Sequence, residues 1–158
     1  MVVLVHTRRL RRFRSVKNFL EIFKVMIKNV IAVHRLQCSA LEEDSPNSMV
    51  NNIEFIKEHS DQINIVVPAK LSINNKVVDK NMVWEFQLVF KTCEQLEVRG
   101  HWAYALDLAD GTRLLIGSLN RPYPVTTSSQ TLPDNLTDSQ LMEITVTWVE
   151  CTGMPVFA

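Results

Sequence analysis

Glycine is scarce in this chain of 158 residues, and its four glycines are isolated from one another. A phosphate-binding loop needs several glycines within a few residues, because the backbone must approach the phosphate closely. The sequence therefore contains no glycine-rich phosphate loop. The glycines are Gly100, Gly111, Gly117 and Gly153.

Cysteine is also rare, and its spacing excludes the common metal and disulfide patterns. Cys38, Cys93 and Cys151 are far apart, odd in number and without a Cys-x-x-Cys pair or a Cys/His cluster. Structural zinc sites use closely spaced ligand pairs. The sequence predicts three reduced, partly buried thiols of a cytosolic protein, and neither a metal nor another cofactor.

Long apolar runs are absent as well. No segment approaches the roughly 20 apolar residues that a membrane-spanning helix requires. Hydrophobic residues still make up 46% of the chain, which is enough to form a core. We therefore expect one soluble domain of ordinary size.

The net charge of zero conceals a strong asymmetry. Residues 1–25 carry a net charge of +6, and residues 26–158 carry −6. Apolar residues recur at helical spacing among the arginines of the first segment, which predicts a short basic amphipathic helix. They are Phe13, Val16, Leu20 and Phe23.

Three interpretations of residues 1–25 remain open. The segment could bind nucleic acid phosphates or an anionic membrane. It could be a targeting segment, although it lacks the order of a signal peptide. We favour a third interpretation, in which the start codon is misassigned and translation begins at Met26, because charge and periodicity change there.

The body of the chain, residues 26–158, alternates with the two-residue period of β-strands. Val30, Ala32, His34, Leu36 and Cys38 are expected on one face of a first strand. Residues 63–73 alternate without a break, and Pro68 indicates an edge position or a bulge. Alternation recurs in residues 84–90, 102–108, 112–116 and 142–150, and a short strand is expected at 53–57.

Turn residues separate these strands. Asp110-Gly111 predicts a tight hairpin, because glycine adopts positive φ without strain. Asn74-Asn75 predicts another turn, while residues 39–52 and 126–139 are expected to be polar connections. The fold class we expect is mainly β: an antiparallel β-sandwich or small barrel, with an N-terminal basic helix.

No catalytic residues can be assigned. His34 is expected to be a buried, hydrogen-bonded core histidine, and His59 and His101 have no nucleophile motif beside them. Asp107 and Asp110 flank the predicted hairpin, where aspartate is common for turn reasons. Four aromatic residues, Trp84, Phe86, Trp102 and Tyr104, are expected in the core rather than on a nucleic-acid-binding face. We predict that the protein is not an enzyme and has no small-molecule substrate.

Residues 116–124, IGSLNRPYP, are the most distinctive segment. Two prolines stiffen it into an extended rod from which Arg121 and Tyr123 project. Two interpretations stay open: an ordered connection in which Tyr123 covers the core edge, or a protein interface formed by Arg121 and Tyr123.

Residues 26–150 resemble small uncharacterised proteins encoded in prophages and mobile elements of Bacteroidetes. The resemblance lies in the opening IKNVIAVHRLQCSAL, the Asp-Gly hairpin, the segment IGSLNRPYP and the final strand ITVTWVE. It implies a virion neck or tail component, located in the virion or in the cytoplasm of a bacterial host.

Two functional hypotheses follow. The first is a non-catalytic structural or assembly protein, whose partners are further copies of itself or other structural subunits. The second is a binding module that contacts nucleic acid or an anionic membrane through residues 1–25.

Overall fold

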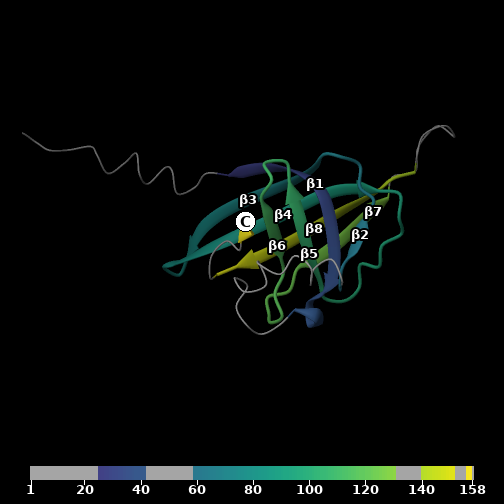
Figure 1. The fold of residues 1–158 in the computed structure, drawn as a ribbon. Coiled ribbons are helices and arrows are strands. Elements are labelled where there is room, and N and C mark those ends of the chain that lie inside the picture. Colours follow the sequence, from purple (N-terminus) through teal and green to yellow (C-terminus); the bar gives the residue numbers. More distant parts are fainter. Residues whose placement is uncertain (1–24, 42–58, 131–139, 152–155, 158) are drawn as a thin grey trace, which may run out of the picture.

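The computed structural model describes residues 25–41, 59–130, 140–151 and 156–157 (Figure 1). The basic helix expected within residues 1–25 and the strand expected at 53–57 lie outside the described residues, apart from Val25. The described elements are nine strands and one 3-10 turn. They are β1 (Met26–Gln37), η2 (Cys38–Ala40), β2 (Asp61–Ile63), β3 (Ala69–Val78), β4 (Asn81–Thr92), β5 (Trp102–Leu108), β6 (Arg113–Ile116), β7 (Val125–Gln130), β8 (Met142–Glu150) and β9 (Val156–Phe157).

All nine strands belong to a single antiparallel sheet. Their order is β7-β8-β4-β3-β1-β5-β6-β9, and β2 pairs with β1 beside β3. The mainly β, antiparallel class expected from the sequence is confirmed. The described strands do not form two separate facing sheets. Instead one sheet curls into a half-barrel, so that β5 and β6 cross in front of the long strands β3, β4 and β8 (Figure 1).

The main core fills the concave side of this half-barrel. Alternate residues of the central strands point inward, as the two-residue period requires. Burial of so many apolar side chains is the principal stabilising term of the fold. The buried members of this core are Val30, Val33, Ile63, Ala69, Leu71, Ile73, Phe86, Leu88, Phe90, Tyr104, Leu106, Leu108, Leu114, Ile116, Ile144, Val146 and Trp148.

A bulge in β1 corrects the predicted face of the first strand. Val30 pairs with Leu108 and Ala32 pairs with Asp107, so that Ile31 has no partner in β5. One extra residue reverses the alternation of a strand. Val33 therefore joins Val30 in the main core, while Leu36 turns to the opposite face.

The convex face of β1, β5 and β6 carries a second, smaller core. Ala103 and Ala105 are small enough to let the connection after β6 and the residues around η2 lie close against the sheet. Leu119 and Tyr123 pack on this cluster from that connection. Its buried members are Leu36, Cys38, Leu41, Ala103, Ala105 and Leu115.

The predicted Asp-Gly hairpin is confirmed between β5 and β6. Gly111 has a φ of 84°, and its N–H donates to the Leu108 carbonyl at 3.0 Å. Asp110 accepts hydrogen bonds from the backbone N–H and the hydroxyl of Thr112. The local turn chemistry therefore decides the structure here.

The turn predicted at Asn74-Asn75 is wrong. Both residues lie inside β3, where they pair with Glu85 and Trp84. The chain reverses instead at Asp79 and Lys80, whose φ values are 49° and 68°. Positive φ at both central residues is the requirement of a tight hairpin turn, and aspartate tolerates it better than most residues.

Two further boundaries differ from the sequence prediction. The alternation of residues 63–73 is interrupted between β2 and β3, where Pro68 follows a cis peptide bond. The position predicted as a strand edge or a bulge therefore lies between two strands. Residues 126–130 were predicted within a polar loop and instead belong to β7, because they pair with the end of β8. Residues 131–139 lie outside the described residues, whereas the predicted last strand, Met142–Glu150, is confirmed at both ends.

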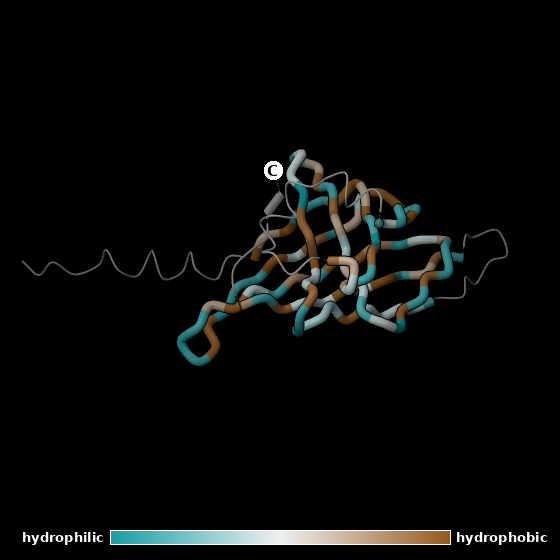
Figure 2. Tube along the Cα trace, turned by 60° about the horizontal axis from the view of Figure 1, so that its bottom comes forward, coloured by the Kyte–Doolittle hydropathy of each residue, from teal (hydrophilic) through white to brown (hydrophobic). Residues whose placement is uncertain are grey.

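The hairpin of β3 and β4 extends beyond the core. Beyond the Ile73–Phe86 pair, β3 no longer pairs with β1, and β4 pairs with β8 only as far as Trp84. The last part of the hairpin is therefore held only by the pairing of β3 with β4. Figure 2 shows it projecting from the rest of the chain, with polar and apolar residues near its tip. Val77 and Met82, which face each other across it, are 53% and 42% exposed.

Candidate functional site

The predicted interface residues Arg121 and Tyr123 lie in the connection between β6 and β7. Arg121 is exposed and precedes a cis peptide bond to Pro122. Tyr123 is half-buried and packs against the second core. Tyr123 thus covers the edge of a core, which agrees with the interpretation of this segment as an ordered connection. Arg121 is exposed at the surface.

Tyr123 forms a stacked pair with His101. The two ring centroids are 4.0 Å apart, and the ring planes are inclined by 18°. His101 is exposed and immediately precedes β5. The pair joins two segments that are distant in the sequence, and sequence reasoning had not connected them.

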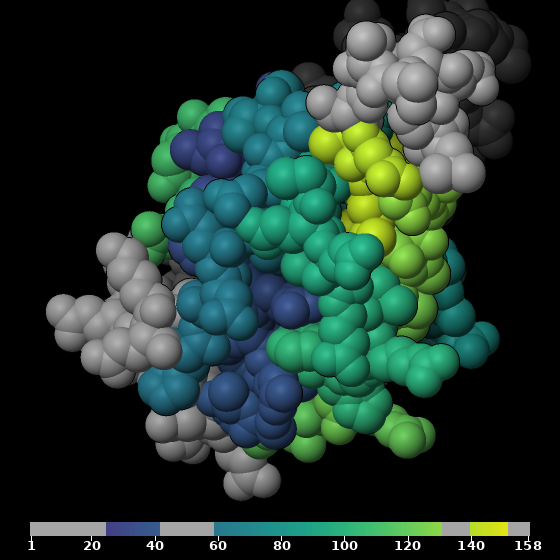
Figure 3. Space-filling view, turned by 90° about the vertical axis from the view of Figure 1, so that its right-hand side faces the viewer, coloured from purple at the N-terminus to yellow at the C-terminus, as the bar shows by residue number. Residues whose placement is uncertain are grey.

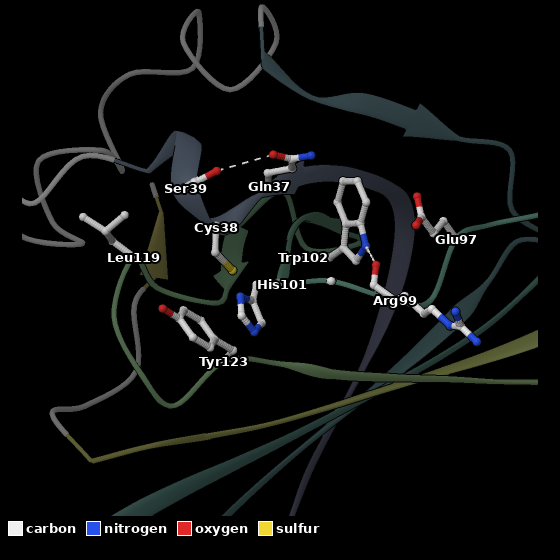
Figure 4. Close-up of a pocket in the computed structure, with 10 residues that line it drawn as sticks. Gln37, Cys38, Ser39, Glu97, Arg99, His101, Trp102, Leu119 and Tyr123 are labelled. Atoms are coloured by element: carbon white, nitrogen blue, oxygen red, sulfur yellow. Dashed lines mark hydrogen bonds between the residues drawn. The ribbon is translucent and has the colours of Figure 1, made fainter.

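Two pockets adjoin this stacked pair. The first has a volume of about 450 Å³ and lies between the end of β1, residues 97–102 and the connection after β6 (Figure 4). The second, of about 620 Å³, lies between residues 98–101 and 121–126. Gly100, His101 and Tyr123 line both pockets, so the stacked rings form part of the wall of each.

Residues 97–102, in the segment after β4 and at the start of β5, line the two pockets. Figure 3 shows the segment after β4 lying across one end of the half-barrel, between β1 and the β7–β8 pair. The Arg35 guanidinium lies 4.1 Å from the centre of the Trp102 ring and donates to the Glu97 carbonyl at 3.0 Å. The Trp102 indole N–H donates to the Arg99 carbonyl at 2.8 Å. These contacts fix residues 97–102 against β1.

Cys38 lines the first pocket but is a poor nucleophile. Burial raises the pKa of the Cys38 thiol to about 11, while a hydrogen bond with the Ser118 backbone lowers it less. The thiolate is the reactive form of cysteine, and at neutral pH this side chain is a thiol. The arrangement of Cys38 beside His101 in one pocket therefore does not produce an activated nucleophile.

The remaining histidine prediction is only partly met. His34 is half-buried on the outer side of β1, with its Nε2 atom 3.8 Å from the Asp107 carboxylate. Asp107 also forms an ion pair with Arg113, whose Nε atom lies 2.6 Å from the carboxylate. This group lies at the sheet surface and lines neither of the two pockets beside the stacked pair. We interpret it as a cross-strand charge cluster.

Strand β7 forms one edge of the sheet and continues directly from the connection that carries Arg121 and Tyr123. All six of its residues pair with β8 in an uninterrupted register. Within the described residues, no backbone hydrogen bond joins β7 to any other segment. Its outer edge carries no lysine, no proline and no bulge, the devices that usually protect an edge strand.

Two other kinds of feature are absent from the described residues. No group of three or more histidine, cysteine, aspartate or glutamate side chains is placed to hold a metal ion. Among the same residues, no helix has the length and apolar character needed to cross a membrane.

Comparison of the chain with protein-family models, with curated proteins and with solved structures finds no significant match.

Several site residues were missed by sequence reasoning. Trp102 was expected in the core, and it is only partly buried beside the first pocket. The alternation of apolar residues in β5 predicts which face Trp102 lies on, but not that this end of the strand extends past the core. The proximity of Gly100 to His101 was visible in the sequence, but the partner ring of Tyr123 was not, because it arrives from the other side of the fold.

Proposed function

We propose that this chain is a non-catalytic assembly subunit that associates with a second copy of itself through the outer edge of β7. The observation that carries this proposal is the outer edge of β7, with which no other described strand pairs. An edge strand presents a row of backbone donors and acceptors that another strand can pair with.

The composition of β7 favours a second copy as its partner. Two identical strands pair antiparallel around a two-fold axis, so each residue faces a residue of the same strand. A charged strand would repel its own copy in this arrangement. The β7 sequence VTTSSQ carries no charge, and five of its six residues are exposed. The edge is therefore compatible with pairing to itself.

The opposite edge of the described sheet does not offer the same surface. It ends in β9, which is only two residues long and pairs with Arg113 and Leu114 of β6. Short edge strands are themselves a protection against pairing. Association through β7 would thus produce closed dimers rather than open chains of sheets.

The self-association is tested by adding one positive charge at the edge. Thr127 is exposed and lies opposite the uncharged Thr145. In a two-fold pairing, Thr127→Lys brings two like charges close together across the interface. Gln87→Lys is the matched control, because Gln87 is exposed on an internal strand between uncharged Ser72 and Thr147.

The measurement is molar mass by light scattering over a concentration series up to several hundred micromolar. We expect the full chain and Gln87→Lys to reach twice the chain mass, and Thr127→Lys to remain monomeric at the same concentrations. A monomeric parent chain throughout this range contradicts the proposal. So does a Thr127→Lys variant that associates like its parent.

The setting in which such a subunit works is a further proposal. The resemblance of residues 26–150 to prophage-encoded proteins supports a virion neck or tail component, in a virion or in the cytoplasm of a bacterial host. The genes next to this one test the setting. Portal, capsid or tail genes would support it, and a neighbourhood of unrelated metabolic genes would contradict it.

A second candidate function uses residues 1–25. The charge of +6 on this segment, against −6 on residues 26–158, favours binding to nucleic acid phosphates or an anionic membrane. It predicts salt-sensitive binding that disappears when residues 1–25 are deleted. Mass spectrometry of the native protein is a direct check, because a chain that begins at Met26 lacks the segment altogether.

A further inference from the structure

The two pockets beside the His101–Tyr123 pair form a preformed site that adjoins β7 only through Val125 and Thr126, which line the second pocket. Their shared wall consists of two stacked rings, and Trp102 lines the first pocket as well. Figure 4 shows the rings of His101 and Tyr123 near the Cys38 side chain, with Trp102 on the other side of the pocket. Flat aromatic walls of this kind bind flat ligand rings.

Three contacts hold in place the segments that carry the wall. The Cys38 N–H donates to the His101 carbonyl at 2.9 Å. From the opposite side, the Trp148 indole N–H donates to the Pro122 carbonyl at 2.8 Å. Gly117 approaches the Cβ atom of Ala103 so closely that a side chain at position 117 would lie only 2.8 Å from it. A ligand would therefore meet an ordered surface, and little ordering entropy is lost on binding.

Arginine is concentrated around this wall. Residues 26–158 contain four arginines, and Arg35, Arg99 and Arg121 all lie next to the two pockets or to the residues that line them. The fourth, Arg113, is paired with Asp107. Among the described residues that line the two pockets, Glu97 is the one acidic residue. A body with a net charge of −6 thus has a locally positive site.

The three arginines differ in their availability. Arg35 stacks on Trp102 and donates to the backbone carbonyl of Glu97, so it positions the Trp102 ring. In Figure 4 the Arg99 guanidinium extends away from the rings at the rim of the first pocket. Arg121 is exposed and lines the second pocket together with apolar residues of the connection. Arg121 is therefore the principal anion-binding candidate, and Arg99 adds positive charge at the rim.

We propose that this site binds a nucleotide unit, with the base against the aromatic wall and the phosphate at Arg121. Guanidinium groups bind phosphate through paired hydrogen bonds, and aromatic rings stack on nucleobases with little sequence preference. A neutral sugar would use the rings but has no need of the arginines. The unit comes either from a free mononucleotide or from single-stranded nucleic acid.

The proposal is tested by calorimetric titration of the full chain with adenosine monophosphate, adenosine and a short oligothymidylate. Arg121→Gln removes the charge of an exposed residue, and His101→Ala removes one ring of the wall. Lys70→Gln is the matched control, because Lys70 is an exposed cation on β3. Far-UV circular dichroism and the Tm of each variant show that the fold is retained.

We expect Arg121→Gln and His101→Ala each to weaken binding about tenfold, and Lys70→Gln to leave it unchanged. Binding of both the monophosphate and the oligonucleotide assigns a general nucleotide site, and binding of the oligonucleotide alone assigns single-stranded nucleic acid. No binding of either, equal affinity for adenosine and its phosphate, or equal losses in all three variants overturns the proposal. Thr127→Lys should bind like the parent chain, so failure of the dimer and failure of this site are distinguished.

Discussion

At the scale of single residues, burial separates Cys38 from Cys93 and Cys151, although all three thiols were expected to be partly buried. Cys38 is 1% exposed, whereas Cys93 and Cys151 are exposed. The raised pKa of Cys38 adds a second barrier, because the thiolate is the reactive form. Composition alone gave no reason to distinguish the three.

We therefore expect two of the three thiols to react rapidly with Ellman's reagent in the folded protein. The third should react only when denaturant exposes it. The measurement is the number of equivalents of coloured thionitrobenzoate that the reagent releases per chain, followed over time by absorbance. In Cys38→Ala the slow phase should be missing and the two rapid equivalents retained. Three rapid equivalents in the native parent chain would contradict the assignment.

Asp110 illustrates a residue whose charge matters at the surface. Its carboxylate accepts from the Lys28 ammonium at 2.8 Å and from the hydroxyl and N–H of Thr112. These hydrogen bonds, that of Lys28 first, hold the pKa of Asp110 well below its ordinary range. A depressed pKa in the folded state stabilises the fold above the unfolded-state pKa, and this stabilisation is lost as the pH falls.

Asp110→Asn should therefore lower the Tm at neutral pH, and the difference from the parent chain should shrink between about pH 5 and pH 2. Thermal unfolding across this pH series measures it. Lys28→Gln should reproduce part of the neutral-pH loss, because Lys28 supplies the largest cause of the shift. A Tm difference that is constant with pH would show that the charge of Asp110 is irrelevant.

At the scale of elements, Gly117 decides how the connection between β6 and β7 leaves the sheet. Its φ is 124°, and an added Cβ atom would lie 2.8 Å from the Ala103 Cβ atom and 3.0 Å from its Cα atom. Gly111 also has positive φ, but nothing lies within 4 Å of its added Cβ position. A side chain at position 111 would meet only an unfavourable backbone conformation, whereas a side chain at position 117 would also clash with Ala103.

Gly111→Ala should lower the free energy of unfolding by about 1 kcal/mol, through the backbone conformation alone. Gly117→Ala should lower it by about 3 kcal/mol, because the clash with Ala103 is added. Urea unfolding of both variants measures the two losses. Equal losses would mean that the close approach of the connection to β5 has no energetic weight.

The elements also show where local sequence signals were sufficient. Asp110-Gly111 formed the expected hairpin because its turn needs only residues that are adjacent in the chain. Asn74-Asn75 did not form a turn, because β4 supplies partners that hold both residues in a strand. Asparagine is frequent in turns, yet pairing with a long neighbouring strand outweighs that local preference.

At the scale of the whole molecule, one curled sheet supplies both layers of the core. Strand β5 crosses over β3, β4 and β8, and its Leu106 is buried together with six of their residues that were expected on apolar faces. These six residues are Leu71, Ile73, Phe86, Leu88, Ile144 and Val146. The curl leaves β7 at one edge and brings the connection after β6 over the end of the half-barrel. The proposed dimer edge and the proposed nucleotide site are both products of this arrangement.

The sequence by itself determined the mainly β class, the inward faces of β3, β4, β5 and β8, and the hairpin at Gly111. These features depend on residues that are close in the chain, through a two-residue period or a turn. Only the tertiary structure decided the bulge in β1, the unprotected edge of β7 and the stacking of His101 on Tyr123. Each of these depends on which strand lies beside which, and pairing between distant segments leaves no periodic signal in the sequence.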